Sequence, residues 1–323
     1  MSVLVYTENW DGAFKKQTFE LASYASSLAA MLSVEPVAVS IGSVNEEELN
    51  KLAAYGIKKI IRVEDESLKL FDSRTYARLI SDIALKEDAG TLVLANNNAG
   101  KALAPRLSVR LKAAVCSAVN QLPESIEPFV IRKKVFSGNA IARAGLLTDV
   151  KIVTLAQNSF DVTEQKTDAT IEDYQPGWTD IAEDISVLEQ EKQTGKVLLT
   201  DAEVVVSGGR GMKSPENWKP LEELAVLLDG ATACSRPVSD EGWRPHEEHT
   251  GQTGKIIAPN LYFAIGISGA TQHLAGISSS KVIVAINNDK DAPIFEAAQY
   301  GIVGDAAKIL PKLVDAVRES KSS

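Results

Sequence analysis

The chain has 323 residues, of which 45% are hydrophobic and 24% charged, and a formal net charge of −9. This length exceeds what one ordinary core organises, so we expect two domains. The negative charge argues against nucleic acid as a partner, because nucleic-acid binding depends on clustered Lys and Arg.

Cysteine usage and the N-terminus bear on the compartment. Cys116 and Cys234 are the only cysteines and form no CxxC pair, so we expect a reducing compartment and no zinc framework. The N-terminus opens directly into an apolar strand, without the pattern of a signal or transit peptide. Apolar runs stay shorter than the about 20 residues that span a bilayer. We therefore expect a cytoplasmic α/β protein without membrane insertion.

The N-terminal half alternates predicted strands and helices. Short apolar runs predict strands at Ser2–Thr7, Pro36–Gly42, Lys58–Val63 and Thr91–Asn97. Apolar spacing of three and four residues predicts helices at Lys16–Leu32, Glu46–Ala54, Thr75–Leu85 and Ala99–Leu111. This alternation is typical of a parallel sheet with helices on both faces. We expect the sheet to be extended by further strands at Ala113–Val119, Pro128–Phe136 and Lys151–Ala156.

One segment of this half could bind a ligand. The run ANNNAGKALAPRL, Ala95–Leu107, places three asparagines and a glycine between a strand and a helix. A nucleotide could bind there, at the carboxyl end of the sheet. The run lacks both GxxxxGK[ST] and GxGxxG. Simple helix capping is the favoured interpretation, and nucleotide binding remains the alternative.

The composition changes in Val162–Glu191, which is polar and acidic and contains a Pro176–Gly177 pair. We interpret it as a connector with one more strand at Ser186–Glu191. The domain boundary is placed near Lys196. This gives a nucleotide-binding-like α/β domain over 1–195 and a second domain over 196–323.

Two segments of the C-terminal half carry an arginine among small residues. In Ala202–Ser214 a strand ends in glycines that flank Arg210, whose fixed charge suits phosphate; a tight turn is the alternative. In Ala231–Trp243 small residues lead to Ser235 and Arg236. Taken alone, that segment favours a surface salt bridge worth under about 1 kcal/mol.

Two further segments combine glycine with polar side chains. In His249–Lys255 the polar side chains between glycines can hydrogen-bond a flat heterocycle. The spacing of His246 and His249 matches no zinc motif, so we expect a solvated loop there. The run Leu261–Gly276 predicts a strand, a small turn and a helix start whose N–H groups can face a phosphate. His273 lies in that first turn, and a core histidine bonded to a carbonyl is the alternative.

Polar residues also follow the last two predicted strands, at Asn287 and at Asp305. Every polar cluster of this half therefore comes directly after a strand. In a parallel sheet this places all of them on one edge, where ligands of such sheets bind.

Five ordered segments together resemble the α subunit of electron transfer flavoproteins. They are SGGRG, SRPVSDEGW, GQTGK, LYFAIGISGATQHLAG and AINNDKDAPIFEAAQYGIVGD. The resemblance is specific over 204–317 and extends over the whole chain. It implies two α/β domains, each a mostly parallel sheet flanked by helices, with a Rossmann-like FAD-binding fold in the second. It also implies that the N-terminal domain packs on a partner β subunit that carries AMP.

The resemblance implies FAD contacts motif by motif. Arg210 lies in the glycine turn at FAD, and Arg236 lies against the isoalloxazine ring. His273 lies near the C2 carbonyl of that ring, and Asn287 and Asp305 contact the adenosine half. The cofactor-binding residues implied in full are Arg210, Ser235, Arg236, Thr250, Gly251, Gln252, Thr253, Ser268, Gly269, Ala270, Thr271, Gln272, His273, Asn287, Asp305 and Ala306.

The resemblance further implies an electron carrier rather than a substrate-converting enzyme. The heterodimer would accept electrons from flavin dehydrogenases of the acyl-CoA dehydrogenase type, in fatty acid β-oxidation, and pass them to a membrane quinone oxidoreductase. Permanent positive charge at Arg236 would favour the reduced, anionic flavin in a site of low dielectric constant. Donor, acceptor and the choice between simple transfer and bifurcation stay open. An NAD(P)- or nucleotide-binding α/β protein is the alternative.

Overall fold

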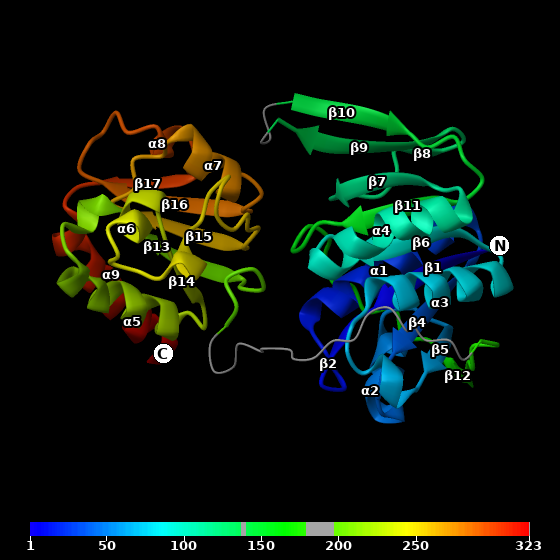
Figure 1. Cartoon of the computed structure of the whole chain (residues 1–323). Coiled ribbons are helices and arrows are strands. Elements are labelled where there is room, and N and C mark those ends of the chain that lie inside the picture. The colour runs from blue at the N-terminus through cyan, green and yellow to red at the C-terminus, as the bar shows by residue number, and fades with distance from the viewer. Residues whose placement is uncertain (137–139, 179–196, 323) are drawn as a thin grey trace. The chain divides into compact units, whose positions relative to one another are not determined.

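The structure is a computed structural model that describes residues 1–136, 140–178 and 197–322 (Figure 1). The chain divides into two compact units, the first over 1–133 and 141–191 and the second mainly over 192–323. The expected boundary near Lys196 and the expected strand Ser186–Glu191 lie outside the described residues. Each unit is described by itself.

A parallel sheet of seven strands, in the order β12-β5-β4-β1-β6-β11-β7, forms the first unit. Its strands are β1 (Ser2–Thr7), β4 (Glu35–Ile41), β5 (Lys59–Val63), β6 (Ala89–Ala95), β7 (Ala114–Val119), β11 (Lys151–Leu155) and β12 (Thr170–Asp173). Every residue of β1 is buried, as expected for a central strand that is covered on both faces.

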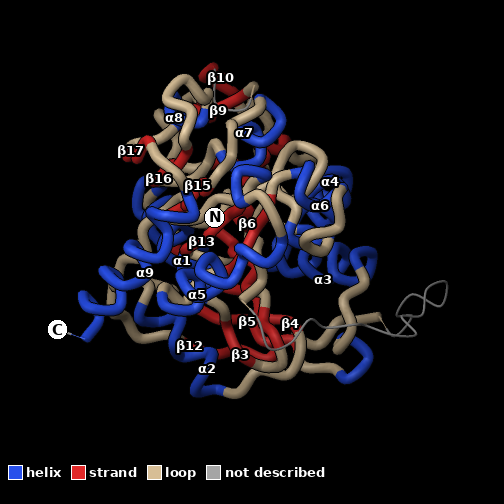
Figure 2. Tube along the Cα trace, turned by 90° about the vertical axis from the view of Figure 1, so that its left-hand side faces the viewer, coloured by secondary structure: helices blue, strands red, loops and turns tan. Residues whose placement is uncertain are grey.

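Helices cover both faces of this sheet (Figures 1 and 2). They are α1 (Lys16–Leu32), α2 (Glu46–Asn50), α3 (Ser73–Lys86) and α4 (Asn98–Leu111). Side chains of β1 alternate between two cores. Val3 and Val5 pack with α1, whereas Leu4 and Tyr6 pack with α3 and α4. The expected alternation of strands and helices is therefore confirmed.

The prediction for Pro128–Phe136 is wrong about the sheet it joins. The strand forms as β9 (Phe129–Val135), but it lies between β8 (Ser125–Ile126) and β10 (Ala140–Gly145) in a separate three-stranded sheet. β8 and β9 pair antiparallel across a short turn, which needs no crossover helix. A second small hairpin joins β2 (Asn9–Trp10) and β3 (Ala13–Phe14).

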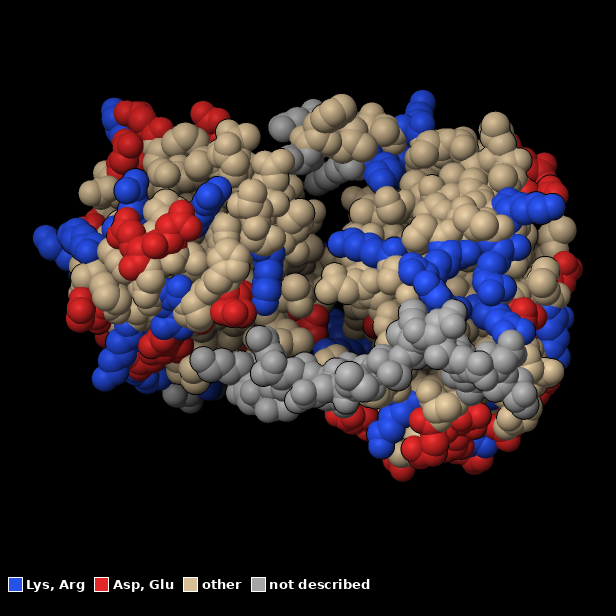
Figure 3. Space-filling view, viewed as in Figure 1, with Lys and Arg blue, Asp and Glu red and all other residues tan. Residues whose placement is uncertain are grey.

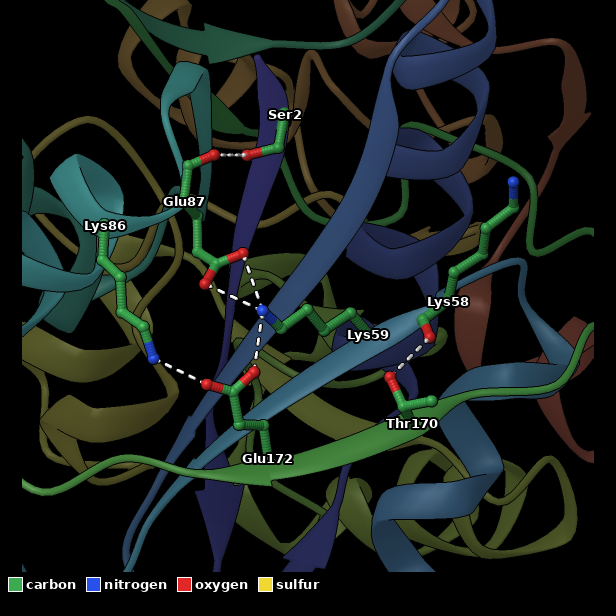
Figure 4. A network of polar contacts seen from close by, with 7 residues as sticks. All are labelled: Ser2, Lys58, Lys59, Lys86, Glu87, Thr170 and Glu172. Carbon is green, nitrogen blue, oxygen red and sulfur yellow. Dashed lines mark hydrogen bonds and ion pairs between the residues drawn. The ribbon is translucent and has the colours of Figure 1, made fainter.

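Strand β12 lies in the segment that we predicted to be a connector. Its four residues are all exposed or partly exposed, so they give no apolar run. Ion pairs join it to its neighbours (Figure 4). Lys59 Nζ lies 2.9 Å from Glu87 Oε1 and 2.8 Å from Glu172 Oε2, and Lys86 Nζ lies 2.6 Å from Glu172 Oε1. Hydrogen bonds from Lys59 and Lys86 lower the pKa of Glu172 to about 2.

Five parallel strands, in the order β14-β13-β15-β16-β17, form the sheet of the second unit. They are β13 (Val204–Gly208), β14 (Ala231–Cys234), β15 (Leu261–Ile265), β16 (Val282–Asn287) and β17 (Tyr300–Val303). The helices are α5 (Lys219–Leu227), α6 (Arg236–Asp240), α7 (Thr271–Ile277), α8 (Ile294–Ala297) and α9 (Ala306–Ser322). Helices α7 and α8 pack on one face, and α5 and α9 on the other.

Short 3₁₀ helices complete the two units, at Lys51–Ala54, Glu66–Leu68, Arg210–Met212, Pro215–Trp218 and His246–Glu248. Both units are mostly parallel sheets flanked by helices, so the predicted fold class is confirmed. Within the described ranges, no helix combines the length and apolar character needed to cross a membrane.

Candidate functional site

The carboxyl ends of the five parallel strands form one edge of the second sheet. In chain order these strands are arranged 2-1-3-4-5, a doubly wound order whose ligand crevice opens between the first and third strands, here β13 and β15. The segments at this edge are Gly209–Met212, Ser235–Arg236, Gly266–His273, Asn287 and Gly304–Asp305. The expectation that the polar clusters share one edge is confirmed for these five segments, whereas His249–Lys255 follows a 3₁₀ helix rather than a strand.

The glycines after β13 and β15 allow two turns to pack backbone against backbone. A Cβ atom on Gly209 would lie 2.2 Å from the carbonyl oxygen of Gly266, and one on Gly211 would lie 2.6 Å from the Gly266 Cα. Gly211 N donates to the same carbonyl at 3.0 Å, and Gly266 has a φ of +63°. The glycines of SGGRG therefore allow close packing against the neighbouring turn that contains Gly266. It places Arg210 beside the crevice.

Two arginines bring positive charge to this edge. Arg210 is exposed at the tip of its turn. Arg236 is also exposed, and its Nε lies 3.3 Å from Asp240 Oδ2. This is the surface ion pair that its segment, taken alone, predicts. Because 65% of the Arg236 side chain is exposed, the pair is weak, and exchanging Asp240 for an anionic ligand costs little.

His273 is buried beneath the edge rather than exposed on it. Its Nε2 lies 2.9 Å from the Tyr262 hydroxyl, and only 7% of the residue is exposed. Burial lowers the pKa of His273 to about 4, although the nearby Thr250 carbonyl opposes the shift. The imidazole is therefore neutral at pH 7. The alternative interpretation of a core histidine near a backbone carbonyl agrees with this burial and with the Thr250 carbonyl, and the Tyr262 hydroxyl is an additional partner.

The prediction of a solvated loop at His246–His249 is wrong for His249, which is 3% exposed. Arg244 holds this loop, with its guanidinium 2.7 Å from Glu248 Oε1 and 2.6 Å from Glu222 Oε1. Burial, and then the neighbouring His246, lower the pKa of His249. The spacing of the histidines carries no information about burial. The ion pair joins Arg244 to Glu248, four residues further along the chain, and is the signal that sequence reasoning missed.

Two buried polar atoms at this edge lack a hydrogen-bond partner among the described residues. They are His249 Nδ1 and Thr250 Oγ1. An unpaired buried polar group costs about 1–3 kcal/mol, so native proteins satisfy nearly all of them with protein, water or ligand. Both atoms lie in the loop before Gly251, and this loop pairs with the end of β14 and is joined to α7. Unsatisfied polar atoms in this loop fit a polar ligand such as a flavin dinucleotide.

Several predicted contact residues stay accessible. Gln252, Thr253, Ser268, Ala270, Thr271 and Gln272 are exposed. Gln252 N donates to the Gln272 carbonyl at 2.8 Å, which joins the loop at 251–255 to α7. Gly251 has a φ of +153°. The structure therefore brings the loop His249–Lys255, predicted to bind a flat heterocycle, beside the turn after β15 that is predicted to face a phosphate.

Other predicted contact residues are occupied within the protein. Asn287 Nδ2 donates to the Ile267 carbonyl at 2.9 Å, and its Oδ1 accepts from Asp289 N at 2.9 Å. Asp305 begins α9 by accepting from Ala307 N at 3.0 Å, and Lys213 Nζ, 3.1 Å from Asp305 Oδ2, lowers its pKa.

Three more of the predicted residues have evident packing roles. Ala306 lies in the core, and Ser235 is 8% exposed with its N–H donating to Gly208 O. Gly269 has a φ of +87°, and a Cβ atom there would lie 2.4 Å from Ile294 N. Together with Asn287 and Asp305, these residues hold the turns that carry the exposed edge.

At the carboxyl edge of the first sheet, side chains hydrogen-bond within the protein. Asn97 Nδ2 lies 3.0 Å from both carboxylate oxygens of Glu8, and Asn97 Oδ1 accepts from Gly100 N at 2.9 Å. A Cβ atom on Gly100 would lie 1.7 Å from the Ala95 carbonyl oxygen. The favoured interpretation of Ala95–Leu107 as a helix cap is therefore the one seen.

Both cysteines are buried and reduced, and burial raises the pKa of Cys234 to about 12. Among the residues that the structure describes, no three His, Cys, Asp or Glu are arranged to hold a metal ion.

Comparisons with known proteins match both units. Residues 198–278 match the family described as the electron transfer flavoprotein FAD-binding domain, and residues 3–176 match the electron transfer flavoprotein domain. Electron transfer flavoprotein subunit alpha of Bacillus subtilis (strain 168) is 34% identical, over 98% of this chain and 97% of the relative. The subunit alpha of Pseudomonas aeruginosa is 33% identical over 98% and 100%. Protein FixB of Escherichia coli O6:K15:H31 is 39% identical over 75% and 78%.

Proposed function

Because this chain belongs to the electron transfer flavoprotein family, as an alpha subunit with an FAD-binding domain, we propose that it is the FAD-holding half of a heterodimeric electron carrier. Its partner would be the electron transfer flavoprotein β subunit, with AMP, packed on residues 1–195. The carrier would accept electrons from flavin dehydrogenases of the acyl-CoA dehydrogenase type and pass them to a quinone oxidoreductase. A cytoplasmic location belongs to the same proposal.

One observation carries the assignment of the site: two unpartnered buried polar atoms, His249 Nδ1 and Thr250 Oγ1, lie at the same edge of the sheet as two exposed arginines. When bound there, FAD supplies the one-electron chemistry. Within the described part of this edge, His249 and His273 are buried and have lowered pKa values, so neither is a proton donor at pH 7. This supports a carrier rather than an enzyme that makes or breaks bonds in a substrate.

The charges of the chain would set the redox balance. Arg236 can leave its weak ion pair with Asp240 and lie against a ring that gains negative charge on reduction. His273 is buried and neutral at pH 7, and its Nε2 is engaged by Tyr262, so it adds no positive charge at the ring. Permanent positive charge at the ring is therefore proposed to come from Arg236.

The proposed contacts divide by accessibility. Gln252, Thr253 and the turn 268–272 would touch the cofactor directly, as exposed groups. Asn287, Asp305 and Ala306 would act by holding the turns, because their polar groups or side chains are engaged within the protein.

An absorption spectrum of the chain, co-expressed with its proposed partner subunit, tests the assignment. Flavin bands and a reversible reductive titration are expected. Arg236→Ala should lower the reduction potential by tens of millivolts, since about 59 mV corresponds to tenfold in a one-electron equilibrium. Lys312→Ala, on the exposed side of α9, is the matched control and should leave the potential unchanged. A colourless protein that takes up no added FAD, or an unaltered potential in Arg236→Ala, would contradict the proposal.

A further inference from the structure

A groove crosses the outer surface of α3 and α4 in the first unit. These helices pack side by side on one face of the sheet (Figure 1). The groove has a volume of about 460 Å³. It is lined by Arg74, Ala77, Pro105, Arg106, Val109 and Arg110. None of these residues belongs to the edge of the second unit described above.

The charge of these two helices is opposite to that of the chain. The chain has a net charge of −9, yet α3 and α4 carry six Lys or Arg and a single acidic residue, Asp82. Helix α4 has no acidic residue at all. Figure 3 shows Lys and Arg gathered across this part of the face. A mixed surface would intersperse both signs, so this one is suited to negative charge.

Apolar residues lie between these charges. Leu103 and Leu107 of α4 point into the core, whereas Val109 is 81% exposed and Pro105 is also exposed. Pro105 and Val109 are four residues apart and therefore adjacent on the helix surface, as are Arg106 and Arg110. The outer face of α4 thus presents an apolar stripe beside a stripe of guanidinium groups.

The groove is open to solvent, and this exposure favours some kinds of ligand over others. Five of its six lining residues are exposed, and only Ala77 is buried. A small molecule needs a site that encloses most of its surface. An amphipathic helix needs only a groove that receives one of its faces. The exposed apolar stripe disfavours a nucleic-acid backbone, which offers phosphates and no apolar face.

We propose that the groove between α3 and α4 binds an acidic amphipathic helix of a partner protein. Apolar side chains of that helix would cover Pro105 and Val109, and its carboxylates would pair with Arg106 and Arg110. Guanidinium groups can bind carboxylates through two parallel hydrogen bonds. Arg106 now donates to the Ala102 carbonyl of its own helix at 2.9 Å, and the other N–H groups of its guanidinium remain for a partner. The proposal does not depend on flavin binding.

The test uses the full chain, co-expressed with its proposed β subunit, and a fluorescein-labelled peptide. The peptide is an acidic helix of about 18 residues with leucines at every third or fourth position and glutamates between them. Fluorescence anisotropy should show binding that weakens when salt is raised from about 0.05 M to about 0.2 M. Arg110→Glu and Val109→Ser should each weaken binding on the order of tenfold. Lys312→Glu on α9 is the matched control and should not change it.

Any of four results would overturn the proposal. The first is no peptide binding. The second is equal weakening of binding by Arg110→Glu and Lys312→Glu. The third is equal binding of a peptide with every glutamate replaced by glutamine. The fourth is displacement of the peptide by inorganic phosphate or single-stranded DNA at the concentration at which the unlabelled peptide displaces it. Circular dichroism establishes that each variant is folded. Flavin content is measured separately, so failure of the proposed function is distinguishable from failure of this proposal.

Discussion

The two units have the same kind of parallel sheet, but their carboxyl edges differ. In the first unit, Thr7 donates to the Val39 carbonyl at 2.9 Å, and Asn97 pairs with Glu8 and Gly100. In that unit, Ser40 Oγ is the buried side-chain atom that lacks a hydrogen-bond partner among the described residues. In the second unit His249 Nδ1 and Thr250 Oγ1, at its carboxyl edge, have no partner among the described residues. A doubly wound sheet therefore does not by itself make a ligand site, and the pairing of its edge atoms decides.

Glycine substitutions should show the largest difference between the edges. Gly209→Ala should lower the free energy of unfolding by about 3 kcal/mol, because its Cβ would meet the Gly266 carbonyl oxygen, and flavin should be lost as the turn moves. Gly100→Ala should destabilise the first unit similarly while flavin is retained. Gly177→Ala meets nothing within 4 Å and should change neither quantity. Thermal unfolding measures the stability, and flavin absorbance measures the flavin content. Normal flavin content in Gly209→Ala would contradict the proposed difference between the two edges.

Acidification should act on the second unit, which contains all three histidines of the chain. The unfolded chain protonates His273 near pH 6.5, but the folded chain does so only near pH 4. Stability from the neutral, buried His273 is thus present above pH 6.5 and falls as the pH drops toward 4, by up to about 3 kcal/mol. Denaturant unfolding of the FAD-free chain at several pH values measures this. His273→Gln should flatten the profile, and an identical slope in that variant would refute the assignment.

Loss of the asparagine cap should affect the first unit alone. Asn97→Ala removes the bond to Gly100 N and the contact with Glu8, so the free energy of unfolding should fall by about 1 kcal/mol. Flavin content should stay unchanged. Asn98→Ala, at the exposed neighbouring position, is the control. Loss of a bound ligand in Asn97→Ala would show that the first edge is also a binding site.

A matched pair of Thr→Val changes should have opposite signs. Thr7→Val removes a hydroxyl that donates to a carbonyl and should destabilise the chain by about 1 kcal/mol. Thr250→Val removes a buried hydroxyl without a partner in the described structure, so it should stabilise the FAD-free chain by up to about 1 kcal/mol. FAD affinity should fall on the order of tenfold in Thr250→Val alone. Chemical denaturation and FAD titration test this pair, and equal destabilisation by both changes would count against it.

Sequence patterns sufficed for most elements of the fold. The helices Lys16–Leu32 and Ala99–Leu111 were predictable because their apolar spacing is local, and the shared edge of the second sheet followed from parallel strands that each end in polar residues. The family also followed from the sequence, since five motifs in order are far more specific than any one of them.

The tertiary structure decided those features that the local spacing of apolar residues cannot predict. Strand β9 joined a separate sheet and β12 formed from exposed residues, because strand pairing depends on partners that are distant in sequence. His249 is buried, and His273 meets Tyr262, because packing of several loops excludes water there. The length of the chain and the order of its apolar and glycine-rich segments thus determined that this is a two-unit α/β chain with a glycine-rich edge. Which polar atoms stay unsatisfied at that edge was decided only by contacts between residues far apart in the chain, since burial and hydrogen bonding belong to pairs of residues rather than to single positions.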